Sequence, residues 1–172
     1  MNVKTSAAAV AVALGLYLLM KLKSEKLPLG IRNNNPLNLR EVGIPWNGKT
    51  GENGGFTTFE TPHYGIRAAA NNMKNSYLSG NTTIEKIISE WAPETENNTA
   101  AYIASVSQKT GIAATENITA MPQLVEIIKA MIYHENGQQP YGNALIERAV
   151  YDGALFGAAL PDTFDISGGV YV

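Results

Sequence analysis

Apolar residues after position 60 recur at spacings of three and four, which is the period of an amphipathic α-helix. Five such stripes predict five helices, and helix-stopping residues separate them. Pro93 ends the second stripe, Asn98 or Thr99 caps the third, and Gly111 closes it. The apolar positions, stripe by stripe, are Ile66, Ala69, Ala70, Met73 and Tyr77; Ile84, Ile87, Ile88 and Trp91; Tyr102, Ile103 and Val106; Leu124, Ile127, Ile128, Met131 and Ile132; and Leu145, Ile146 and Val150.

The segment before these helices has a different pattern. Residues 37–40 and 56–59 each alternate between apolar and polar positions, which predicts two short strands that form one hairpin. An Asn-rich turn at 33–36 and a glycine-rich loop at 47–55 lie around them. The predicted fold class is therefore mainly α (α+β), a helical domain with a small β-hairpin. Residues after Leu160 show no period and are expected to form a C-terminal tail.

Residues 5–20 carry no charge and are mostly apolar. As a helix they span about 24 Å, and flanking lysines at positions 4, 21 and 23 can extend their reach toward the ~30 Å of a bilayer core. We expect an N-terminal transmembrane helix that serves as an uncleaved anchor. A cleaved signal peptide fits less well because the run ends in Met-Lys-Leu-Lys rather than a small-residue site. A helix packed inside a particle is the third interpretation.

The lysines after this segment outnumber those before it, which places the following domain on the cytoplasmic side of a membrane. The predicted organisation is 1–26 as anchor and linker, 27–160 as the globular domain and 161–172 as the tail.

Composition excludes several function classes. The chain has 172 residues and a formal net charge of −2, which excludes a strongly basic protein that binds nucleic acid through its phosphates. It has no cysteine, so thiolate metal sites and cysteine nucleophiles are excluded as well. Its two histidines, His63 and His134, are too few for a histidine-rich metal cluster. We expect no metal and no cofactor.

Glu135 interrupts the fourth apolar stripe. Eleven residues at 100° each bring it to within about 20° of Leu124, at a position where the period requires an apolar side chain. Burial and the negative end of the helix dipole both favour the protonated form of a carboxyl group there, and a general acid must be protonated. The alternative is that Glu135 emerges at the helix end and meets solvent or Arg148. His134 is expected to be a polar neighbour.

Residues 132–140, Ile-Tyr-His-Glu-Asn-Gly-Gln-Gln-Pro, resemble the catalytic segment of lysozyme-like lytic transglycosylases. That resemblance implies that Glu135 is the single catalytic acid and base. Residues 30–40, 46–48 and 55–59 resemble a group of phage and prophage virion proteins that includes virion-associated transglycosylases. In the usual transglycosylases the catalytic glutamate precedes the Asn-rich region, whereas here it follows. A circularly permuted lysozyme-like fold explains this order; otherwise Glu60 or Glu41 is the rival acid.

The resemblance also implies a groove that binds a sugar chain. The candidate substrate-binding residues are Asn35, Asn38, Arg40, Trp46, Phe59, Tyr102, Gln138 and Tyr141. Each has an ordinary structural interpretation too: the asparagines before Pro36 form turns by themselves, and the aromatic rings are often core residues. Glu60 is expected to end a strand and cap the next helix.

The function implied is cleavage of peptidoglycan glycan strands. With one acid, the sugar's own 6-hydroxyl closes a 1,6-anhydro ring, although hydrolysis stays open. The alternative is a non-catalytic, membrane-anchored structural or glycan-binding virion protein with a lysozyme-like fold. Expected partners are peptidoglycan strands, a membrane through residues 5–20 and other virion proteins, with no nucleic acid. A phage virion with an internal membrane, or the bacterial inner membrane, is the expected location.

Overall fold

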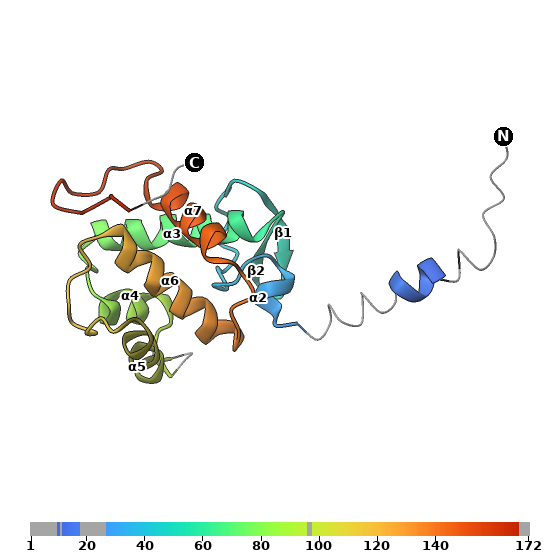
Figure 1. Ribbon diagram of the computed structural model, residues 1–172, viewed down its shortest axis with the longest axis horizontal. Coiled ribbons are helices and arrows are strands. Elements are labelled where there is room, and N and C mark those ends of the chain that lie inside the picture. The colour runs from blue at the N-terminus through green and yellow to red at the C-terminus, as the bar shows by residue number, and fades with distance from the viewer. Residues whose placement is uncertain (1–9, 11, 18–26, 96–97, 169–172) are drawn as a thin grey trace.

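The computed structural model describes residues 10, 12–17, 27–95 and 98–168. Its architecture is mainly helical with one small antiparallel sheet, as the sequence pattern predicts (Figure 1). The elements are α2 (Leu29–Arg32), β1 (Lys49–Asn53), β2 (Phe56–Phe59), α3 (Pro62–Leu78), α4 (Ile84–Trp91), α5 (Thr99–Thr110), α6 (Met121–Asn136) and α7 (Asn143–Ala154).

Helix α6 lies at the centre of the fold and packs against α2, α5 and α7 (Figure 1). Its apolar stripe supplies much of the core, because Ile127, Ile128, Met131 and Ile132 are all fully buried. Burial of such side chains contributes roughly 1.5–3 kcal/mol each. The five predicted helices are therefore confirmed, and α6 fixes the positions of its neighbours.

The predicted helix ends are confirmed as well. The Asn98 side chain accepts a hydrogen bond of 3.1 Å from the backbone N–H of Ala101 and so caps α5. Gly111 and Gly137 follow α5 and α6 with left-handed φ angles of 71° and 67°. Such a conformation ends a helix and is readily adopted by glycine.

The predicted hairpin is correct in one strand and wrong in the other. Strand β2 occupies 56–59, but its partner is β1 in the glycine-rich loop, and residues 37–40 form no strand. The reason is Asn38, whose φ angle of +52° is incompatible with an extended strand. Arg40 forms an isolated bridge to Phe56, and the Leu39 carbonyl accepts a hydrogen bond of 2.9 Å from the Thr57 N–H.

The expected transmembrane helix is contradicted. Within the part of the chain that the structure describes, no helix is long and apolar enough to cross a membrane. Residues 12–17 are helical. The other positions of the predicted 5–20 segment, apart from Val10, lie outside the described residues.

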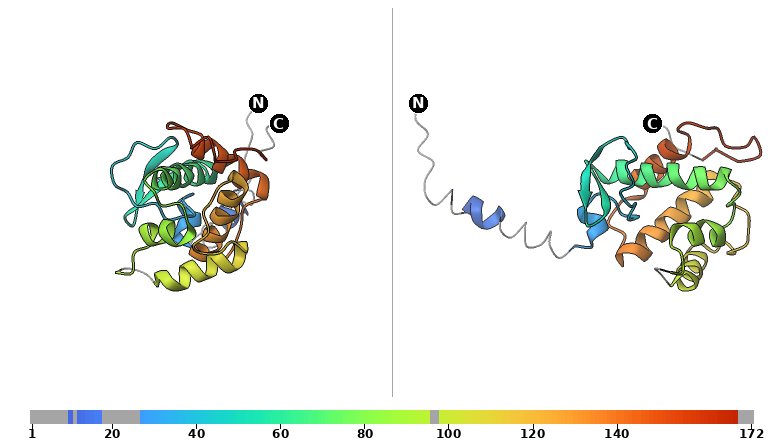
Figure 2. Two further views of the ribbon diagram at one scale, coloured as in Figure 1. Left: turned by 90° about the vertical axis from the view of Figure 1, so that its left-hand side faces the viewer. Right: turned by 180° about the vertical axis from the view of Figure 1, so that it is seen from behind.

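The segment after α7, predicted to be a tail, lies against the helical body (Figure 2). Phe164 is buried and meets the Tyr77 ring edge-on at 5.3 Å. The Asp165 carbonyl accepts a hydrogen bond of 2.8 Å from the backbone N–H of Met121, and Tyr151 donates to Ser167. Residues 161–168 therefore help to cover the core.

The contact between α3 and α7 depends on Gly153. A Cβ atom there would lie 2.2 Å from the carbonyl oxygen of Arg67 and 2.9 Å from the Cβ of Ala70. We predict that Gly153→Ala lowers the free energy of unfolding by about 2–3 kcal/mol, because two backbones must separate. Urea denaturation measures this change.

Gly142→Ser is the matched control for this prediction. Nothing lies within 4 Å of a Cβ at Gly142, which is the N-cap of α7. Serine is a good N-cap, so the free energy of unfolding should change by no more than about 0.5 kcal/mol. Equal stability of Gly153→Ala and the wild type would contradict the packing argument.

Candidate functional site

The Glu135 carboxylate lies in the last turn of α6 and is held by two hydrogen bonds. Tyr102 on α5 donates its hydroxyl to Oε1 at 2.8 Å, and Asn38 donates Nδ2 to Oε2 at 2.8 Å. The side chain is half-buried. Arg148, the alternative partner, lies 4.0 Å from Asp152 and forms no ion pair with Glu135 within the described ranges. The carboxylate is therefore fixed by residues that are far apart in the sequence.

Tyr102 positions this acid from inside the core. The residue is 3% exposed, and its ring stacks on His134 at 3.8 Å between centroids and 12° between planes. Burial, followed by the charge of Glu135 and the hydrogen bond to it, raises the pKa of Tyr102 well above its ordinary value. The hydroxyl therefore stays protonated and donates to Glu135. It is placed to orient the acid and not to stack on a sugar.

Asn38 reaches Glu135 because the loop around it is anchored to α6. Asn136 is buried and donates Nδ2 to the Pro36 carbonyl at 2.7 Å and to the Ile132 carbonyl at 2.8 Å. A Cβ on Gly30 would lie 2.8 Å from Oδ1 of Asn38 and 2.9 Å from Oδ1 of Asn136. Glycine is thus required where α2 passes these two amides. The contacts of Asn136 with Pro36 and the close approach of Gly30 set the position of Asn38 beside the carboxylate.

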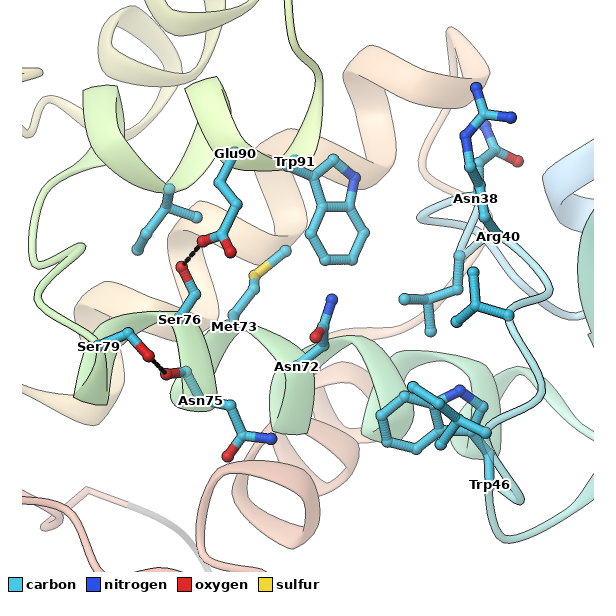
Figure 3. Close-up of a pocket in the computed structure, with 14 residues that line it drawn as sticks. Asn38, Arg40, Trp46, Asn72, Met73, Asn75, Ser76, Ser79, Glu90 and Trp91 are labelled. Carbon is cyan, nitrogen blue, oxygen red and sulfur yellow. Dashed lines mark hydrogen bonds between the residues drawn. The ribbon is translucent and has the colours of Figure 1, made fainter.

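A cavity of about 430 Å³ begins at Asn38 and lies between helices α3 and α4 and the loop 38–46 (Figure 3). Glu135 is not one of the residues that line the cavity; Asn38, which lines it and donates to Glu135, connects the two. The half-buried rings of Trp46 and Trp91 contribute aromatic surface. The lining residues are Asn38, Leu39, Arg40, Val42, Ile44, Trp46, Asn72, Met73, Asn75, Ser76, Ser79, Ile87, Glu90 and Trp91.

Three of the predicted substrate-binding residues line this cavity, namely Asn38, Arg40 and Trp46. Asn35 does not: it is fully buried, and its side chain bonds the backbone of Leu39 and Thr57. Asn35 therefore holds the turn together, which is the structural interpretation.

The remaining predicted residues lie away from the cavity lining. Phe59 is 3% exposed and belongs to the core. Gln138 is exposed beyond the end of α6, and Glu60, the rival acid, is exposed after β2, where Thr61 and not Glu60 is the N-cap of α3. Tyr141 is partly buried, and burial raises its pKa to about 12.

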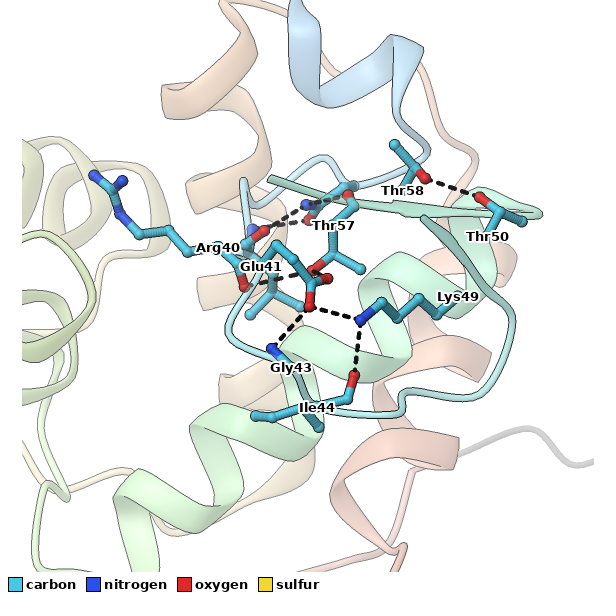
Figure 4. A network of polar contacts seen from close by, with 10 residues as sticks. Arg40, Glu41, Gly43, Ile44, Lys49, Thr50, Thr57 and Thr58 are labelled. Atoms are coloured by element: carbon cyan, nitrogen blue, oxygen red, sulfur yellow. Dashed lines mark hydrogen bonds and ion pairs between the residues drawn. The ribbon is translucent and has the colours of Figure 1, made fainter. Parts of the chain in front are cut away.

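Glu41, the other rival acid, is engaged in a structural network (Figure 4). Its carboxylate accepts hydrogen bonds from Lys49 Nζ at 2.6 Å, the Gly43 N–H at 2.8 Å and the Thr57 hydroxyl at 3.2 Å. These contacts lower the pKa of Glu41. The hydrogen bond from Lys49 contributes most, and those from Gly43 and Thr57 add to it. The network fixes the loop that carries Val42, Ile44 and Trp46 along the cavity.

Sequence reasoning missed the helical side of the cavity. Asn72, Asn75, Ser76 and Ser79 line it at spacings of three and four, so they form a polar stripe along α3. The spacing of these polar residues is the feature of the sequence that could have indicated this wall of the cavity. The sequence pattern places Trp91 on an apolar stripe, and in the structure it also lines the cavity.

The described ranges hold no group of three or more His, Asp or Glu side chains placed to bind a metal ion. The side chains at and beside the cavity supply a carboxyl group, amides, hydroxyls and aromatic rings.

The raised pKa of Tyr102 predicts how stability depends on pH. Above about pH 10 the unfolded chain loses the phenolic proton while the folded protein keeps it, so stability falls as pH rises. Tyr102→Phe removes this contribution. Between about pH 9 and pH 11 the free energy of unfolding should fall more steeply for the wild type than for Tyr102→Phe. Urea denaturation across this range measures both slopes, and equal slopes would contradict the assignment.

Comparison with known proteins gives one informative relationship. No protein-family model matches the chain. It is 39% identical over 139 residues to Protein P5 of Pseudoalteromonas phage PM2, an alignment that covers 77% of this chain and 86% of that protein. Identity at this level over most of both chains means that they share a fold and an ancestor. The chain therefore belongs to the family of the phage protein P5.

Proposed function

We propose that this protein cleaves peptidoglycan glycan strands as a lytic transglycosylase, with Glu135 as its general acid and base. The observation that carries the proposal is the Glu135 carboxylate, held by Tyr102 and by Asn38, and Asn38 also lines a cavity of about 430 Å³. Cavities of this size hold small ligands, and here the lining combines amides with indole rings, which suits saccharides.

The hydrogen bonds leave the carboxyl group able to carry the reacting proton. Each carboxylate oxygen has two lone pairs, and Tyr102 and Asn38 occupy one on each oxygen. Protonated Glu135 gives its proton to the glycosidic oxygen, the C–O bond breaks, and the leaving sugar departs as an alcohol. The carboxylate then takes the proton of the 6-hydroxyl while that oxygen bonds to the anomeric carbon. The ring closes, and Glu135 is protonated again without water.

The absence of a comparably placed second acid among the described residues favours this route over hydrolysis. Glu41 is bound by Lys49, and Glu60 is exposed and is not one of the residues that line the cavity. Glu90 lines the cavity but lies on the other side from Asn38 (Figure 3). A second carboxylate that serves as nucleophile or activates water would have to lie close to the same sugar.

The family relationship supports a phage role. We propose that the protein is a virion component that opens the host wall during penetration, because a phage needs to cut peptidoglycan at entry and the P5 relative is a phage protein. A non-catalytic structural or glycan-binding protein remains the competing outcome of the experiments below.

The proposed activity predicts that the full chain releases muropeptides with 1,6-anhydro ends from purified peptidoglycan. Glu135→Gln should strongly reduce this release. Glutamine keeps the shape of the side chain but has no proton to transfer, so turnover should fall about 10²- to 10⁴-fold. Mass spectrometry of the soluble products measures it. Glu60→Gln, which removes the same charge away from the cavity, should cleave at the wild-type rate.

The products separate the competing functions. Products with reducing ends instead of 1,6-anhydro ends would show that the protein is a hydrolase and not a transglycosylase. No products from the folded wild-type protein, with glycan binding retained, would contradict an enzymatic function and favour the binding protein.

A second prediction concerns Asn38, which has a φ angle of +52°. Asn38→Gly keeps this conformation accessible but removes the amide that donates to Glu135. We expect kcat to fall about 10- to 100-fold, the cost of a hydrogen bond to a charged group. Asn34→Gly is the control, because Asn34 has the same φ angle but bonds Phe59 and Glu60 carbonyls instead. Equal kcat values for the two variants would contradict the role of Asn38.

A further inference from the structure

Glu90 presents a carboxylate to the cavity on the side away from Asn38 (Figure 3). It lies in the last turn of α4, and its Oε2 accepts hydrogen bonds from the Ser76 hydroxyl and from Asn81 Nδ2, the latter at 2.8 Å. These contacts fix the carboxylate against α3. Its Oε1 has no hydrogen bond to any residue in the described ranges. The Glu90 carboxylate is therefore oriented and still has an oxygen available to a ligand.

No basic side chain among the described residues pairs with the negative charge of the Glu90 carboxylate. Among the residues that line the cavity, Glu90 is the acid and Arg40 the base, and they lie on opposite sides (Figure 3). Lys86, one turn before Glu90 on α4, donates to the Gly80 carbonyl at 3.3 Å. No ion pair joins Glu90 to any of the described residues. The C-terminal end of α4 adds partial negative charge at the same place.

Trp91 extends this anionic surface with an indole ring. It follows Glu90 in the chain, is half-buried, and lies beside Glu90 along the cavity wall (Figure 3). An ammonium group is attracted both by a carboxylate and by the face of an indole ring. The pair is thus complementary to a small cation carried on a larger polar ligand.

We propose that the Glu90–Trp91 end of the cavity binds a primary ammonium group of the peptidoglycan that the site holds. This inference rests on the proposed function. Two sources carry the same chemistry: the free amine of a de-N-acetylated amino sugar, and an amine on the peptide attached to the glycan. An N-acetylated amine carries no charge and leaves the Glu90 carboxylate without its counterion. Glu90 is then a specificity-determining residue that favours amine-bearing substrate.

The test compares cleavage of matched substrates by the full chain. One pair is peptide-free glycan strands with and without partial de-N-acetylation. The other is peptide-bearing strands with their free amines intact or chemically acetylated. The readout is the ratio of kcat/KM for the amine-bearing substrate to that for its acetylated partner, and the pair that gives a ratio above one identifies the source of the ammonium.

We expect the wild type to prefer the amine-bearing member of at least one pair by up to about fivefold, the upper end for an ion pair at an exposed carboxylate such as Glu90. Glu90→Gln should bring that ratio to about one. Glu85→Gln is the matched control, because it removes the same charge from the exposed first turn of α4 outside the cavity lining. Its ratio should equal that of the wild type.

Salt gives a second measurement that needs no variant. The wild-type preference should shrink as ionic strength rises from about 20 mM to about 500 mM, because counterions screen an ammonium–carboxylate pair. A preference that persists in folded Glu90→Gln, or one that salt leaves unchanged, would overturn the proposal.

Binding separates failure of this proposal from failure of the proposed function. If the wild type cleaves no substrate, the enzymatic function fails, and calorimetry with a glucosamine tetramer and an N-acetylglucosamine tetramer then tests the ammonium site alone. Tighter binding of the glucosamine tetramer that depends on Glu90 supports the site. If the wild type cleaves the substrates with equal efficiency and binds both tetramers equally, the ammonium proposal fails while the enzymatic function stands.

Discussion

The hydrogen bonds to Glu135 are the contacts on which the rest of this site depends. A half-buried carboxylate needs partners, because an ionised group removed from water without them is strongly destabilising. Tyr102 brings α5 to the end of α6, and Asn38 brings the Asn-rich loop to the same point. Asn136, the next residue in the chain, fastens that loop at Pro36. One acid therefore joins segments separated by 33 and 97 positions.

Separate contacts hold the two walls of the cavity that Asn38 lines. On one side, Asn35 and the Glu41–Lys49 network hold the loop that carries Trp46. On the other side, α3 and α4 are connected through Glu90. Under the proposed function, walls held in this way would receive a glycan without large rearrangement and so lower the entropic cost of bringing its glycosidic bond to Glu135.

Local patterns predicted the helices well because the apolar period and the capping residues reside within each segment. The position of Glu135 on the α6 stripe was visible for the same reason. Other features depend on contacts between segments. The left-handed conformation of Asn38, which removes a strand, follows from its anchoring near Asn136 and Gly30. Periodicity identified the α3 face that carries Met73, but not that the polar stripe beside it faces α4 across a cavity. Hydropathy and the flanking lysines predicted a membrane-spanning helix that the described part of the chain does not contain.

A crystal structure of the Glu135→Gln protein with a bound peptidoglycan fragment that spans the cavity tests most directly whether Glu135 is the acid of a glycan-cleaving site. If it is, a glycosidic oxygen lies within about 3.2 Å of the side chain at position 135, with sugars extending over Asn38 toward Trp91. A fragment bound on another surface, or a side chain at position 135 that has no contact with the glycan, would contradict it.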